Sequence, residues 1–89
     1  MANPENAYIV VGIHITDRVS HVPSVQSVLT EYGCNIKTRI GLHEVSDGFC
    51  SPNGLLLVEF VGSDELFRNF VSALKDIEGV EVQQMVFPM

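Results

Sequence analysis

The 89-residue sequence is poor in basic residues and has no tryptophan. Five lysine and arginine residues stand against eleven acidic residues, which gives a net charge of −6. Contacts from Lys and Arg to phosphates supply most of the non-specific affinity of proteins for nucleic acids. We therefore expect that this chain does not bind DNA by itself.

Long apolar runs and a cysteine framework are also missing. No apolar run approaches the length of about 20 residues that a membrane-spanning helix needs, and the first residues do not resemble a signal peptide. Two cysteines, Cys34 and Cys50, do not make a disulfide framework. We expect a cytoplasmic protein without membrane contact, with both thiols reduced and with Cys34 as a small buried side chain.

The spacing of apolar residues predicts four strands and two helices. Residues 1–7 are polar and are expected to form a flexible N-terminus, followed by a single domain over residues 8–87. Strands are predicted over residues 8–15, 35–44, 55–61 and 80–87. One helix is capped by Asp17 or Ser20, and the other is capped by Ser63. This order predicts an α+β, ferredoxin-like βαββαβ fold, in which both helices cover one face of an antiparallel sheet.

The other face of that sheet is too apolar to stay in water. The residues expected on it are Tyr8, Val10, Gly12, His14, Leu55, Leu57, Glu59, Met85 and Phe87. Exposed apolar patches of this kind mark interaction surfaces. We expect a homo-oligomer, a dimer or a tetramer, whose interface includes Tyr8, Val10, Leu55 and Leu57.

Smaller expectations concern individual side chains. In the second strand, alternation places Ile36, Ile40 and Leu42 inward and Lys37, Arg39 and His43 outward. Arg39 would then share the open face with Glu59 and form an interfacial ion pair, or else bind the carboxylate of a ligand. His21 is expected to be solvated. In the second helix, Leu66 is expected to join the apolar stripe of Phe67, Phe70, Val71, Leu74 and Ile77.

A polar segment from Val45 to Asn53 follows His43 and is longer than a hairpin loop needs to be, which favours a binding role. Imidazole and thiolate groups bind transition metals, so His43 and Cys50 are candidate ligands, with His14 of a facing copy as a third. The alternative is structural. His43 would be an exposed strand residue bonded to Glu44, Glu59 or backbone, and Cys50 would pack within the loop.

Three residue runs resemble a known family. They cover residues 25–44, 51–55 and 77–82, and the most specific is Thr-Arg-Ile-Gly-Leu-His-Glu at 38–44. These runs resemble the small proteins described as iron-only hydrogenase system regulators, over residues 8–87. The resemblance implies a fold similar to ACT domains and to the C-terminal domain of the nickel-responsive regulator NikR. It also implies a multimeric regulatory module.

Two groups of site residues follow from this resemblance. In ACT domains, the loop after the first strand helps bind an amino acid between subunits, which makes Asp17 and Arg18 candidate ligand-binding residues beside Arg39 and His43. Val19-Ser20 replaces the usual Pro-Gly there. In NikR-like domains, strand histidines and a hairpin cysteine bind a metal. His43 and Cys50 match that pattern, whereas Gly41 stands at the position of the second histidine.

The sequence offers no catalytic pattern. It has no glycine-rich phosphate loop, no evident Ser-His-Asp arrangement and no Cys-x-x-Cys after the first strand. We expect a non-enzymatic, transcription-associated regulatory module of an iron-only hydrogenase system that binds a small effector or a transition metal at a subunit interface. The alternative is an assembly module that recruits a protein partner and binds no ligand.

Overall fold

A computed structural model describes the backbone of residues 7–16, 18–46 and 49–88, and the side chains of residues 7–16, 21–41 and 54–88. The predicted flexible N-terminus lies outside these residues, except Ala7, which begins the first strand. The elements are β1 (Ala7–Ile15), α1 (Arg18–Glu31), the 3-10 helix η2 (Gly33–Asn35), β2 (Ile36–Ser46), β3 (Phe49–Phe60), α2 (Asp64–Lys75) and β4 (Val80–Pro88).

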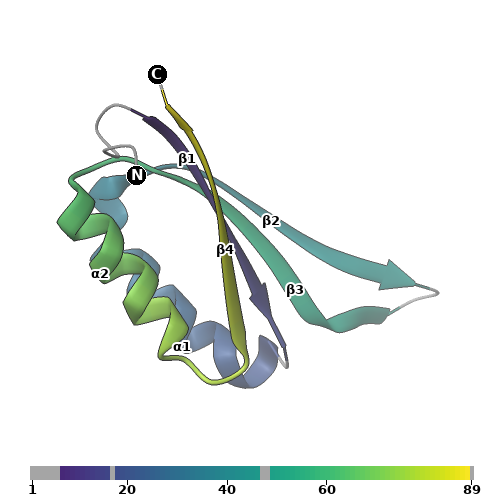
Figure 1. Cartoon of the computed structure of the whole chain (residues 1–89). Coiled ribbons are helices and arrows are strands. Elements are labelled where there is room, and N and C mark those ends of the chain that lie inside the picture. Colours follow the sequence, from purple (N-terminus) through teal and green to yellow (C-terminus); the bar gives the residue numbers. More distant parts are fainter. Residues whose placement is uncertain (1–6, 17, 47–48, 89) are drawn as a thin grey trace.

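The four strands form one antiparallel sheet in the order β2-β3-β1-β4. Both helices cover the same face of this sheet (Figure 1). The arrangement is the predicted α+β ferredoxin-like fold, with β1 and β3 in the centre and β2 and β4 at the edges.

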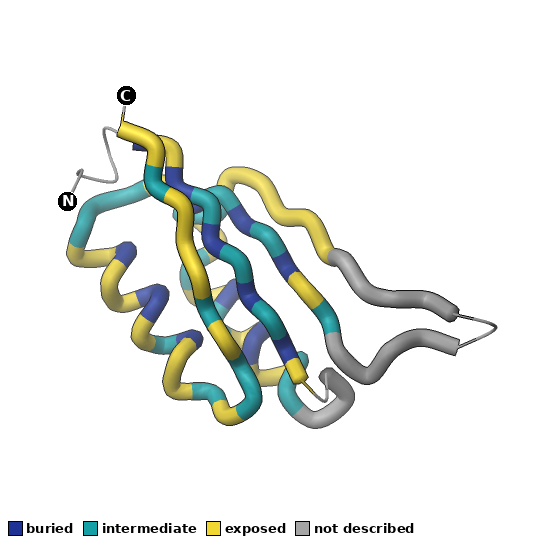
Figure 2. The backbone as a smooth tube through the Cα atoms, turned by 45° about the vertical axis from the view of Figure 1, so that its right-hand side comes forward, coloured by how far each residue is buried: buried dark blue, intermediate teal, exposed yellow. Residues whose placement is uncertain are grey.

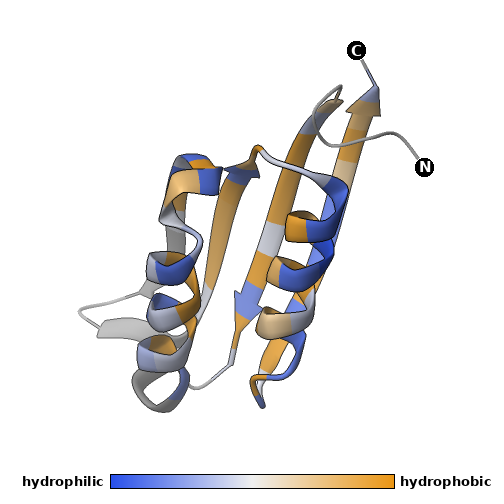
Figure 3. Cartoon of the chain, turned by 90° about the vertical axis from the view of Figure 1, so that its left-hand side faces the viewer, coloured by the Kyte–Doolittle hydropathy of each residue, from blue (hydrophilic) through white to orange (hydrophobic). Residues whose placement is uncertain are grey.

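The core lies between the sheet and the two helices. Along β1, alternate residues from Ala7 to Ile15 are buried, and the residues between them face away from the helices (Figure 2). The apolar sides of both helices turn toward the sheet (Figure 3). Phe60 of β3 stacks on Phe70 of α2, with 5.1 Å between ring centroids. Every buried side chain that the structure describes is apolar.

Several local expectations were wrong. Leu66 is 40% exposed, because it lies about 100° around α2 from Phe67 and therefore beside the buried stripe. Cys34 is exposed in η2, since a 3-10 helix replaces the expected start of a strand. Helix α1 begins at Arg18, which agrees with the cap predicted at Asp17 and not with the one at Ser20. Pro23 lies inside the helix, where the hydroxyl of Ser27 donates a hydrogen bond of 3.2 Å to its carbonyl oxygen.

A one-residue bulge in β2 reverses the orientation predicted for this strand. Ile36 pairs with Phe60, but Thr38 pairs with Glu59, so Lys37 is an extra residue. Because side chains alternate along a strand, one extra residue moves the following side chains to the opposite face. Ile40 is therefore 52% exposed on the face away from the helices, and the predicted inward Ile40 was wrong.

The same bulge places Arg39 on the helix side of the sheet, although it was predicted to face outward. Its Nη2 atom donates a hydrogen bond of 2.9 Å to Oε1 of Gln26 on α1, which places the guanidinium on the helix side of the sheet. Glu59 lies on the opposite face, where it pairs with Thr38 and Val10. The predicted outward Arg39 and its ion pair with Glu59 were therefore wrong.

Strands β2 and β3 continue beyond the end of β1 and project from the body of the protein as a two-stranded arm (Figure 1). The last β1 residue paired with β3 is Ile15, opposite Gly54. Beyond it, Val45 still pairs with Cys50, and Ser46 pairs with Phe49. We call residues 44–46 and 49–53 the arm.

The expected long loop from Val45 to Asn53 was therefore wrong, because its ends are paired strands. Valine and phenylalanine are strand-forming residues, which favours pairing over a loop. The register shift between His43 and Val45 falls opposite the β3 stretch that contains Pro52, a residue without an N–H group to donate to a ladder.

Candidate functional site

The sheet face away from the helices, called here the open face, carries most of the large apolar side chains that are exposed in the described residues. Its central residues are the β1 residues Tyr8, Val10, Gly12 and His14 and the β3 residues Leu55, Leu57 and Glu59. The flanking strands add Thr38, Ile40, Glu81, Gln83, Met85 and Phe87. The structure thus places the four predicted interface residues on one face.

Large side chains of the open face are exposed to an unusual degree. Tyr8, Ile40, Met85 and Phe87 are between 52% and 56% exposed, and Leu55 is 39% exposed. Scattered apolar residues on a surface need no explanation, but a contiguous patch marks an interaction site. This face therefore has the character of a contact surface.

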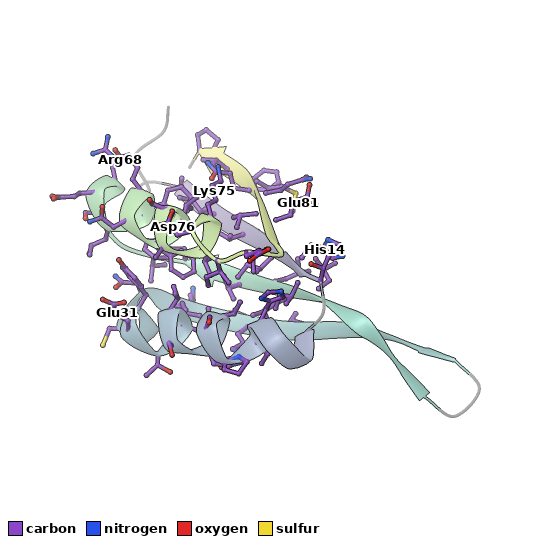
Figure 4. All side chains as sticks on the ribbon, turned by 90° about the horizontal axis from the view of Figure 1, so that it is seen from below. His14, Glu31, Arg68, Lys75, Asp76 and Glu81 are labelled. Atoms are coloured by element: carbon purple, nitrogen blue, oxygen red, sulfur yellow. The ribbon has the colours of Figure 1, made fainter. Side chains whose placement is uncertain are left out.

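Charge on the open face is sparse. His14 Nδ1 lies 3.6 Å from Glu81 Oε1 of the neighbouring β4, and Figure 4 shows the two side chains together at one edge. Glu59 is half-buried near the middle of the face. Among the described side chains, none with a positive charge lies within ion-pair distance of the Glu59 carboxylate.

The strand register gathers several predicted site residues at one end of the sheet. Gly54 pairs with both Ile15 and His43, so His43 lies on the row where β1 ends and the arm begins. His14 is in the adjacent row, and Asp17 and Arg18 follow directly after the end of β1 in the chain. Arg39 does not join them, because it lies four positions before His43, roughly 13 Å along the strand.

At this end of the sheet, the residue after β1 is hydrogen-bonded to the turn that precedes β4. The backbone N–H and the hydroxyl of Thr16 both donate to the carbonyl oxygen of Gly79, at 2.9 Å and 2.8 Å. The ring of His21 is half-buried against Gly79, so the expectation of a solvated His21 was wrong.

The candidate ligand and metal residues are placed by backbone only. Asp17 and the side chains of Arg18, His43 and Cys50 lie outside what the structure describes. Cys50 pairs with Val45, two positions along the arm from His43, whereas His14 is already paired with Glu81. The described residues alone contain no group of three or more His, Cys, Asp or Glu side chains able to hold a metal ion. The metal and ligand roles stay predictions.

Ile40 is the open-face residue that sequence reasoning assigned to the wrong side, because no feature of the sequence marks the bulge at Lys37. Glu81 and Gln83 were absent from the expected face as well. Simple alternation with Met85 would have found them.

No helix in the described parts of the chain is long and apolar enough to cross a bilayer.

Comparison with known proteins shows likeness in structure only. No protein-family model and no curated protein matches the chain. An uncharacterized protein from Thermotoga maritima is 18% identical, with a TM-score of 0.76 over 89% of this chain and 94% of that one. A nitrogen regulatory PII-like protein from Thiomonas intermedia K12, bound to ADP, AMP and bicarbonate, is 12% identical, with a TM-score of 0.55 over 93% and 94%.

A dimeric ferredoxin-like protein from an uncultured marine organism is 7% identical, with a TM-score of 0.50 over 93% of this chain and 94% of that one. At these identities, the likeness shows a shared ferredoxin-like fold.

Proposed function

We propose that this chain is a non-enzymatic, cytoplasmic regulatory module that self-associates through the open face and binds a small effector or a transition metal at the subunit interface. The observation that carries the proposal is the contiguous apolar patch of Tyr8, Ile40, Leu55, Met85 and Phe87 on an otherwise acidic protein. The resemblance at residues 38–44 supports the finer part of the proposal, a transcription-associated role in an iron-only hydrogenase system.

The fold neighbours support the coarse part. One small ferredoxin-like neighbour is described as dimeric, and a PII-like neighbour binds adenine nucleotides and bicarbonate. These two neighbours support self-association and effector binding for this chain. For an 89-residue chain, pairing also adds buried surface that a single small core lacks.

The effector site that we propose lies where β1 ends and the arm begins. Backbone register places His43 in the row of Ile15 and Gly54, one row from His14, and Asp17 and Arg18 follow shortly after Ile15 in the chain. The same end of the sheet carries the open-face edge formed by His14 and Glu81. A ligand bound at this end of the sheet would lie beside the loop after β1 and, at His14, would border the open face.

We expect that a transition metal raises the melting temperature of the wild-type protein and that His43→Ala and Cys50→Ser remove this rise. Binding to the folded state alone contributes about 2.7 kcal/mol of stability when the metal concentration is 100 times its Kd. Calorimetry during titration with Ni²⁺ or Zn²⁺ measures the effect, on protein without a histidine tag. Cys34→Ser is the matched control, because this exposed thiol lies in η2, away from the proposed site.

Identical calorimetric curves for the wild type and both site variants would refute the metal site. If the protein is oligomeric but neither metals nor small effectors shift its melting temperature, the result supports the second candidate function. That function is assembly alone, in which the apolar face and the arm recruit a protein partner without a ligand.

A further expected result is that the chain fails to shift duplex DNA in a gel at physiological salt, because its net charge is −6. The assay compares random and hydrogenase-promoter duplexes over a range of salt concentrations. Tight binding that weakens steeply with salt would contradict this prediction. Without such binding, any transcriptional effect passes through a partner.

A further inference from the structure

We infer that Gly12 is the point of closest approach between two copies of this chain, a recess in the open face that receives a side chain of the second copy. The inference rests on the proposed self-association and adds the residue at which the two copies come into closest contact.

Nothing within a single copy requires glycine at this position. Among the described residues, the glycines with a positive φ are Gly62 and Gly79, so Gly12 has a backbone that any residue adopts. A Cβ atom on Gly12 would lie 3.6 Å from Cδ2 of Leu57 and 3.8 Å from the carbonyl oxygen of Gln83, which are ordinary contact distances.

Glycine is nevertheless the costly choice there. Inside a strand it loses more conformational entropy on folding than alanine and packs no side chain. A glycine inside a strand often marks a bulge, a tight bend, or a place where a ligand or another backbone approaches closely. β1 pairs with both of its neighbours without a register shift, which leaves close approach. Gly12 lies in the middle of the central strand β1, paired with Leu57 on one side and Gln83 on the other.

Gly12 leaves a gap in the row of side chains that β1 presents on the open face. Its neighbours on this face are Val10 and His14 along β1 and its partners Leu57 and Gln83 on β3 and β4, and larger exposed side chains lie farther out. These are Tyr8, Ile40, Leu55, Met85 and Phe87. The face thus contains both a hollow and projecting groups. A two-fold pair can seat a projecting side chain of each copy in the hollow of the other, as isologous interfaces require.

The size of the face fits a second copy. The exposed parts of the five large apolar side chains amount to roughly 400–500 Å² per copy, judged from the areas that such side chains bury. Together with Thr38, Glu59 and Gln83, a pair would bury on the order of 1,200 Å² in total, the lower limit of stable interfaces. A small ligand would cover only part of this area.

The test compares Gly12→Ala with Gly41→Ala. Gly41 is a strand glycine of β2 that pairs with Leu56, whose buried side chain points toward the helices, so it lies on the other side of the sheet. A Cβ atom there would lie 3.9 Å from Cδ1 of Leu56, again an ordinary contact. Sedimentation equilibrium gives the Kd of self-association, and urea denaturation at the lowest concentration of the series gives the stability of each chain.

We expect Gly12→Ala to weaken self-association by about tenfold to a hundredfold, the effect of overpacking a close contact. Its denaturation midpoint at low concentration should equal or exceed that of the wild type. Gly41→Ala should keep the Kd within about twofold of the wild type.

Unchanged self-association of Gly12→Ala would overturn the inference while leaving the proposed function standing. A Gly12→Ala chain that is less stable than the wild type at low concentration would also overturn it, because glycine at this position would then be needed for the stability of a single copy. If the wild type is monomeric at every concentration, the proposed self-association itself fails.

Discussion

Leu57→Glu is expected to convert the oligomer into a folded monomer. Leu57 lies on the open face between Ile40 and Gly12, on the side of the sheet away from the core. A carboxylate buried without a partner in an interface costs several kcal/mol, about 3–5 kcal/mol by analogy with broken buried ion pairs. That cost corresponds to a loss of affinity of at least about a hundredfold. Light scattering coupled to gel filtration measures the mass.

Leu66→Glu is the matched control for this substitution. Leu66 is an exposed leucine of α2, on the opposite side of the molecule from the open face, so the same chemical change there should leave the oligomer intact. Dissociation by both variants would point to a general charge effect on this acidic protein. An oligomeric Leu57→Glu protein would contradict an interface on the open face.

The second large effect is expected for Gly79→Ala, which should destabilise the fold by about 2–4 kcal/mol through strain and overlap. Gly79 has a φ of 82°, in the left-handed region. Its Cβ atom would lie 2.7 Å from Nε2 of His21 and 2.9 Å from the hydroxyl of Thr16. For a domain of this size, we expect a fall in melting temperature of about 10 °C or more. Urea denaturation gives the free energy of unfolding.

Gly33→Ala provides the comparison, because no atom lies within 4 Å of a Cβ at Gly33 and its stability should change little. His21→Ala removes one source of the overlap. In a double-mutant cycle, it should therefore recover part of the stability lost in Gly79→Ala. Additive losses from the two substitutions would show that the ring of His21 is not the obstacle.

The regular elements could be predicted because their patterns are local. The alternation of isoleucine and valine in β1 and the helical stripe of Phe67, Phe70 and Leu74 both report directly which side is buried. The open face followed from the same alternation in β1 and β3. These predictions of fold and face were confirmed by the register of the sheet.

The errors arose where pairing between strands decides the outcome. A bulge depends on how Ile36 and Thr38 meet Phe60 and Glu59, which the sequence of β2 alone does not reveal. The arm was missed for a different reason. Asp47-Gly48 between Ser46 and Phe49 is a two-residue hairpin signal, but the polar residues around it favoured a loop. The convergence of His43 with the end of β1 likewise depends on register.

The place of β1 in the sheet also has a consequence for folding during synthesis. β1 is synthesised before β3 and β4, the two strands with which it pairs, so that Ala7 meets Pro88 at the far end of the domain. Contacts of such high sequence separation form slowly, because a long loop must close first. Until β4 emerges, one edge of β1 stays unpaired, and the sheet is open to association with other nascent chains. The pairing of β1 is therefore complete only after β4 has been synthesised.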